Sequence, residues 1–191
     1  MCNDLFDIKQ QNIDLSKGIL LVSSPFSEDG LFQKSVVLLV EHDENGSLGF
    51  ILNKQTDFKV EEVVSEIESF EAPVLMGGPV SPTNLFFIHR KSTIPKSYHI
   101  IGNTYWMGDF EALITQINAH LISPDSIRFF FGYSGWTKGQ LEAEVKNNFW
   151  LLASSRKYDI WNDNNLWETI LKDMGIDGNL LKTIPDNPSL N

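Results

Sequence analysis

The sequence contains a single cysteine, Cys2, so a disulfide bond within the chain is excluded. Long hydrophobic runs are missing too: the longest aliphatic stretches, 19–22 and 36–40, are far shorter than the roughly 20 residues of a membrane-spanning helix. The first 18 residues carry three aspartates and no apolar segment of the kind found in signal peptides. Together these absences predict a cytoplasmic protein without membrane contact.

Basic residues are also scarce. Lysine and arginine number 15 against 25 aspartates and glutamates, which gives a formal net charge of −10. Because a phosphate backbone is bound largely by cations, this balance argues against direct nucleic-acid binding. The most basic stretch, 89–91 followed by Lys96 and His99, is typical of an ordinary solvated surface.

Hydrophobic residues, in contrast, are sufficient for a substantial core. The 191 residues are 42% hydrophobic and 12% aromatic, which fits a single domain. The sequence contains no internal repeat. Residues 1–17 are predicted to form a polar lead and residues 18–175 the domain. After residue 175 the chain is polar, with two prolines and no periodicity, and we expect a loose tail over 176–191.

Hydrophobic patterning predicts an α+β fold. Apolar runs flank Asn45-Gly46, a strong hairpin signal, and helical spacing recurs elsewhere without a regular βαβ rhythm. This favours a mainly antiparallel or mixed sheet over a doubly wound parallel one. Strands are expected at 19–23, 35–41, 47–53, 74–76, 85–89, 99–101, 127–131 and 150–153, and helices at 60–67, 109–121, 137–147 and 166–174.

A serine nucleophile was tested first, because Gly132-Tyr133-Ser134-Gly135-Trp136 has part of the required pattern. A nucleophile elbow needs Gly-x-Ser-x-Gly, and the last position here is Trp136. Thr137 and Gln140 have the spacing of a capping box, which predicts a helix opening at Thr137. The preceding residues are therefore interpreted as a glycine-rich loop between a strand and that helix.

Metal and cofactor sites find no support in the spacing of ligand residues. Glu41-His42-Asp43-Glu44 is rich in ligand types, but side chains alternate along a strand, so His42 faces away from Glu41 and Asp43. Zinc-ligand spacings and phosphate-binding glycine motifs are absent, and no metal or cofactor is predicted. Glu142 and Glu144 diverge on a helix, although Glu144 shares a face with Gln140.

An ordered set of segments resembles the AlgH/YqgE family, whose members are of unknown function and often labelled transcriptional regulators. The matching residues are 18–25, Phe32, 35–39, Glu41-His42, 46–53, 77–80, 132–136, 139–142, Glu144 and Trp150. The resemblance implies a compact α+β domain with a curved, barrel-like mixed sheet and helices packed outside. It implies no catalytic residues, and Ser134 is a departure from the alanine usual in the family.

Our leading hypothesis is a regulatory binding protein, not an enzyme, that acts through a protein or small-molecule partner. Polar and glycine positions at strand ends and turns are the candidate binding residues, since binding residues often lie on such loops. They are Ser35, His42, Asn53, Gly78, Tyr133, Trp136 and Gln140. The alternative is a hydrolase or transferase with His42 or Glu144 as base, and a direct DNA-binding regulator is third.

Overall fold

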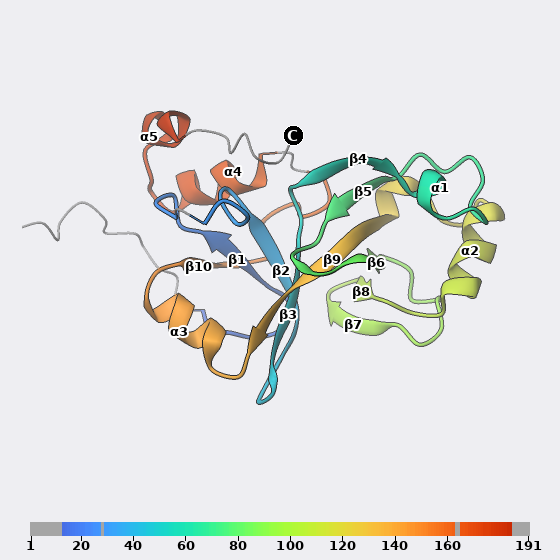
Figure 1. Cartoon of the computed structure of the whole chain (residues 1–191), viewed down its shortest axis with the longest axis horizontal. Helices are drawn as coiled ribbons and strands as arrows, with labels where there is room; N and C mark the ends of the chain where they lie inside the picture. Colours follow the sequence, from blue (N-terminus) through green and yellow to red (C-terminus); the bar gives the residue numbers. More distant parts are fainter. Residues whose placement is uncertain (1–12, 28, 163–164, 185–191) are drawn as a thin grey trace, which may run out of the picture.

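The computed structural model describes residues 13–27, 29–162 and 165–184, and its centre is a ten-stranded mixed sheet (Figure 1). The α+β class predicted from the sequence is confirmed. The strands are β1 (Ile19–Ser23), β2 (Val36–Asp43), β3 (Gly46–Ile51), β4 (Gln55–Lys59), β5 (Pro73–Met76), β6 (Val80–His89), β7 (Tyr98–Ile101), β8 (Thr104–Trp106), β9 (Ile127–Thr137) and β10 (Trp150–Ser154). The helices are α1 (Val60–Val63), α2 (Phe110–Asn118), α3 (Gln140–Lys146), α4 (Leu166–Asp173) and α5 (Gly178–Thr183), with a short 3-10 turn at Pro124–Ser126.

The first half of the sheet follows the predicted apolar runs. β2 and β3 form the antiparallel hairpin around Asn45-Gly46, and β1 lies between β2 and β10, antiparallel to both. All five residues of β1 are buried. Its continuous apolar sequence therefore reflects burial on both faces.

Strand β9 crosses the centre of the molecule and belongs to both halves of the sheet (Figure 1). Its first part pairs with β6 and, in parallel, with β5, and its last four residues pair with β3. The loop predicted over 132–136 is therefore wrong, because the strand continues to Thr137. A Cβ at Gly132 would lie 2.5 Å from the carbonyl oxygen of Gly78, so glycine here permits a close approach of backbones rather than a turn.

The sheet is open. The strand order is β10-β1-β2-β3-β9-β6-β8-β7, with β4 joined through β5, and β5–β9 is the parallel pair. Within the described ranges, no pairing links the end strands β10 and β7, so the sheet does not close into a barrel.

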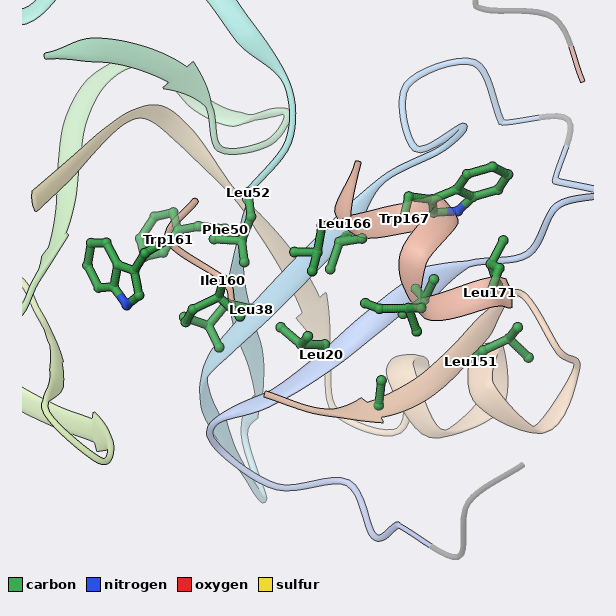
Figure 2. Packing of buried hydrophobic residues seen from close by; sticks show 14 of the residues in the cluster. Leu20, Leu38, Phe50, Leu52, Leu151, Ile160, Trp161, Leu166, Trp167 and Leu171 are labelled. Carbon is green, nitrogen blue, oxygen red and sulfur yellow. The ribbon is translucent and has the colours of Figure 1, made fainter. Parts of the chain in front are cut away.

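Three apolar clusters form the core, and helices cover them from outside. The largest packs α4 and α5 on β1, β2 and β10; Figure 2 shows Leu20, Leu38 and Leu151 of these strands facing Leu166 and Leu171. A second lies under α1 and α2, and a third lies beneath α3 on the opposite side of β1 and β2 from α4. β9 contributes to all three, through Phe130, Phe129 and Trp136.

Helix boundaries differ most from the sequence-based expectations. Helix α1 ends after Val63, where an extended Val64 caps it, instead of reaching residue 67. Helix α2 begins after its N-cap Asp109 as expected but ends at Asn118, so Leu121 lies beyond the helix and is 62% exposed. Helix α5 lies within the segment predicted as a loose tail and buries Leu181 completely, so that boundary is too early. Residues 1–12 and 185–191, in the predicted lead and tail, lie outside the described residues.

Candidate functional site

Glu144, on helix α3, accepts hydrogen bonds through both carboxylate oxygens. Its Oε2 accepts from the indole Nε1 of Trp136 and of Trp150, each at 2.8 Å. Its Oε1 accepts from Nε2 of Gln140 at 3.0 Å, one helical turn earlier on the same face. Strand β9, helix α3 and strand β10 thus converge on one carboxylate, which fixes the two indole rings.

Gln140 links this carboxylate to the end of β9. Its Oε1 accepts from the backbone N–H of Thr137 at 3.0 Å and from the Thr137 hydroxyl at 3.1 Å. The predicted pairing of Thr137 with Gln140 therefore exists, but the helix begins at Gln140, because Gly139 adopts a left-handed conformation (φ 75°) before it. Gln140 therefore bonds back to the end of β9 and does not cap a helix that begins at Thr137.

Three aromatic rings meet at Trp150. The ring of Phe32 lies 5.3 Å from it at an interplanar angle of 77°, and the ring of Trp136 lies 5.9 Å from it at 80°. Both contacts have the edge-to-face geometry that aromatic pairs prefer. Trp136 and Trp150 are only 7% and 3% exposed, so packing as well as hydrogen bonding holds them.

These groups line a cavity of about 500 Å³, within the size range of small-molecule sites. We call it the Glu144 pocket. Its lining residues are Ser23, Ser27, Asp29, Phe32, Pro79, Gly135, Trp136, Gln140, Glu144, Phe149 and Trp150. Among these described residues, two are carboxylates and none is lysine, arginine, histidine or cysteine.

The basic group Lys54 interacts with Asp29, a lining residue of the pocket. Burial lowers the pKa of its ammonium, and the charge of Asp29 opposes that effect. The Lys54 Nζ donates to the Leu31 carbonyl at 2.6 Å. Lys54 therefore offsets part of the charge of Asp29, whereas Glu144 meets only neutral donors among the described residues.

Two of the predicted candidate residues, Trp136 and Gln140, lie in the Glu144 pocket. Asn53 lines a different, larger hollow near Arg128. Its Oδ1 accepts from Val36 N at 2.9 Å, and its Nδ2 donates to the Lys34 carbonyl at 2.7 Å. Ser35 is fully buried, and its backbone N–H donates to the hydroxyl of Ser23, a lining residue, at 2.9 Å. These two residues position the segment that follows Phe32.

The other three candidates lie outside the Glu144 pocket. Tyr133 packs its ring edge-on against Phe86 at 5.5 Å and lines a shallower hollow on the other side of Trp136. Gly78 lies against the backbone of β9, where a Cβ would be 2.4 Å from Ser134 N. His42 Nδ1 lies 2.8 Å from the Ser47 hydroxyl, beside the hairpin turn. The structure therefore divides the predicted set instead of gathering it.

The arrangement offers little for acid–base or nucleophilic catalysis. Glu144 lines the Glu144 pocket, whereas His42 is not one of its lining residues. The Ser134 hydroxyl is fully buried and donates to the Gly77 carbonyl at 3.1 Å, away from any substrate. Within the described part of the chain, no three His, Cys, Asp or Glu side chains are grouped as a metal site would require.

A larger hollow, about 610 Å³, lies near Arg128 and Trp161. The guanidinium of Arg128 donates to the backbone carbonyls of Leu52, at 2.9 Å, and of Trp161. These bonds tie β9 to the residues before β4 and α4.

Sequence reasoning missed several lining residues, chiefly Asp29, Phe32, Phe149 and Trp150. Phe32 and Trp150 belong to the segments that resemble the family, but no spacing marked them as partners of Glu144. Their rings meet only because β10 and the segment before β2 both adjoin β1. That proximity is a property of the sheet order, which the local pattern does not contain.

Comparisons with known proteins agree on one family. A family model described as AlgH-like (DUF179) matches residues 20–179. A UPF0301 protein of Cytophaga hutchinsonii is 40% identical over 181 residues, covering 93% of this chain and 100% of the relative. A UPF0301 protein of Parabacteroides distasonis is 40% identical over 194 residues, covering 98% of each.

Solved structures share the fold. The solution structure of the AlgH protein from Pseudomonas aeruginosa matches with a TM-score of 0.70 and 24% identity over 90% of this chain and 97% of that one. A crystal structure of a protein from Corynebacterium diphtheriae gives a TM-score of 0.69 at 18% identity, covering 93% and 95%. The molecule is thus one of a class of α+β domains built on an open, mainly antiparallel sheet. The chain belongs to the AlgH-like UPF0301 family.

No helix in the described ranges is long and apolar enough to cross a membrane.

Proposed function

We propose that this chain is a binding protein, not an enzyme, and that its ligand occupies the Glu144 pocket. The observation that carries the proposal is the carboxylate of Glu144, which holds Trp136 and Trp150 in place through two 2.8 Å hydrogen bonds on the wall of a cavity. Rings fixed in this way lose little conformational freedom on binding. A regulatory role would follow if the bound ligand altered contacts with a partner.

The same hydrogen bonds favour binding over catalysis. A general base needs a free oxygen within reach of a substrate proton, whereas three donors already occupy Glu144. The described lining also lacks a histidine or cysteine that would act with it. The pocket therefore supports recognition by shape, aromatic contact and charge.

The test is a titration of the full chain with a library of small cationic, neutral and anionic fragments, followed by NMR of the indole N–H groups. We expect ligands to perturb the indole signals of Trp136 and Trp150. Trp150→Phe, which keeps a ring but removes the N–H bonded to Glu144, should weaken binding. Trp106→Phe is the matched control, because Trp106 is buried in the largest apolar cluster and is not a lining residue of the pocket.

Fragments that bind but perturb only residues near Arg128, or only residues of the shallower hollow that Tyr133 lines, would contradict the proposal. So would a Trp150→Phe variant that stays folded and binds every fragment as well as the original chain.

A further inference from the structure

The Glu144 pocket combines aromatic walls with two carboxylates, and Lys54 offsets part of the charge of one of them, Asp29. Phe32, Trp136, Phe149 and Trp150 line it. Trp150 packs edge-to-face against Phe32 and Trp136, at 77° and 80°, and the ring of Phe149 is 56% exposed. The two carboxylates in the described lining are those of Asp29 and Glu144. An anionic ligand such as a phosphate or carboxylate would meet repulsion here and find no cation in the described lining to offset it.

We propose that the Glu144 pocket binds an alkylated ammonium group, carried by a small molecule or by a modified lysine side chain. This inference rests on the proposed function and names the ligand class of the same site. A cation with apolar substituents fits both features, because it is attracted to the faces of aromatic rings and buries its alkyl groups against them. Aromatic cages are a known means of recognising such cations, and the lining of this pocket supplies several aromatic rings.

The hydrogen bonds of Glu144 strengthen this preference. Each indole N–H that donates to the carboxylate at 2.8 Å draws the ring's positive edge toward the anion and leaves its face more electron-rich. Glu144 thus favours a cation in two ways, through its own charge and through the two rings. Because Asp29 lies near Lys54, Glu144 carries the larger part of the electrostatic attraction.

The overall charge of the chain also favours a cationic ligand. A net charge of −10 attracts cationic ligands toward the protein and repels anionic ones, most strongly at low ionic strength. Within the described lining, a bare inorganic cation finds no cluster of three ligand side chains to coordinate it. An organic cation needs no such cluster, since aromatic faces replace the oxygen ligands.

The closing experiment compares choline with 3,3-dimethyl-1-butanol, which has the same shape without the charge. Both are titrated into the full chain at equal ionic strength, with the indole N–H signals as readout. We expect choline to bind at least about tenfold more tightly than the neutral alcohol, as cation–π contacts with more than one ring imply. Tetramethylammonium should bind as well, and acetate should not.

Two variants test the cause. Phe32→Leu keeps the apolar volume but removes a π face, and should lower choline affinity while leaving that of the alcohol nearly unchanged. Glu144→Gln removes the negative charge, and should bring the two affinities closer together. If Glu144→Gln fails to fold, Phe32→Leu alone still decides the question, since its ring does not bond to Glu144.

A second experiment asks whether the ammonium group belongs to a small molecule or to a modified lysine side chain. In it, choline competes with a peptide carrying trimethyllysine. Tighter binding of the peptide assigns the group to a partner protein, and tighter binding of choline assigns it to a small molecule.

Equal binding of choline and the alcohol, or tighter binding of acetate, would overturn the cation inference and leave the pocket as a binding site. If none of these probes binds but other fragments shift the indole signals, the cation inference alone is wrong. If no fragment of any charge shifts them, both proposals fail.

Discussion

Gly78 shows how closely two backbones meet beside the pocket. It has a φ of 151°, and a Cβ there would lie 2.4 Å from both Ser134 N and the Tyr133 carbonyl carbon. Pro79, the next residue, lines the Glu144 pocket. Gly78, a predicted binding residue, packs against the backbone of β9 next to a residue that lines the pocket.

Gly78→Ala should lower the free energy of unfolding by about 2–5 kcal/mol, because overpacking costs about 1–3 kcal/mol and the positive φ adds about 1–2 kcal/mol. Gly102→Ala is the control: its φ is also positive (56°), but no atom lies within 4 Å of the added Cβ. Urea denaturation followed by circular dichroism measures both. Equal losses for the two variants would contradict the close approach at Gly78.

His89 is a buried histidine whose ring nitrogens are both engaged. Nε2 lies 2.9 Å from the Met107 carbonyl, and Nδ1 accepts from the Lys91 backbone N–H at 3.2 Å, which fits a neutral ring. Burial lowers the pKa of His89, and the hydrogen bond to Met107 opposes this in part. The proton therefore binds more readily to the unfolded chain than to the folded one.

Stability should fall as the pH decreases below about 6.5, the ordinary pKa of histidine, and should continue to fall until the lowered folded pKa is reached. The contribution of His89 is fully present above that range. The slope from this group cannot exceed about 1.4 kcal/mol per pH unit. Denaturant titrations between pH 8 and 4 measure it, and His89→Gln should flatten the curve.

Among the elements, β1 to β3 were predictable because their signals are local. Continuous apolar runs and Asn45-Gly46 specify strands and a turn independently of the rest of the chain. Strand β4 was missed, since its sequence QTDFK is mostly exposed and lacks an apolar pattern. Strand β9 was cut short because glycine usually marks a loop, and here it marks close backbone contact.

The site was half predictable for the same reason. Gln140 and Glu144 lie four residues apart, so their shared helix face followed from the sequence. Trp136 and Trp150 come from two strands that are not neighbours in the sheet. Their meeting at one carboxylate depends on where α3 crosses between them, which no local pattern encodes.

Helix α5 gives a prediction about where the domain ends. Leu181 is fully buried in the largest apolar cluster, so Leu181→Ala should cost about 2–5 kcal/mol of unfolding free energy. Leu180, its neighbour, is 38% exposed, and Leu180→Ala should cost far less. Thermal or urea unfolding compares the two variants. Similar losses of unfolding free energy would indicate that α5 does not pack on the core and belongs to the loose tail expected from the sequence.

At the scale of the whole molecule, β9 joins the apolar clusters into one structure. The second cluster, under α1 and α2, contains no tryptophan, and the five tryptophans lie in the other two. Because β9 belongs to all three, we expect them to unfold together.

Leu113→Ala, in the second cluster, should therefore shift the urea midpoint seen by tryptophan fluorescence as much as that seen by circular dichroism. Exposed Leu121→Ala serves as the control and should move neither midpoint appreciably. A shift of the circular-dichroism midpoint alone would show that the second cluster unfolds separately from the two clusters that contain the tryptophans.

The order of the strands also governs when this protein can fold during translation. β3 and β6 both pair with β9 in the middle of the sheet, and β1 pairs with the edge strand β10, so these three pairings cannot form until residues 127–154 have left the ribosome. At about 5–20 residues per second, the nascent chain displays unpaired apolar strand edges for seconds before their partners emerge. Ribosome-associated chaperones should accordingly bind the nascent chain before β9 emerges and release it once β10 has paired.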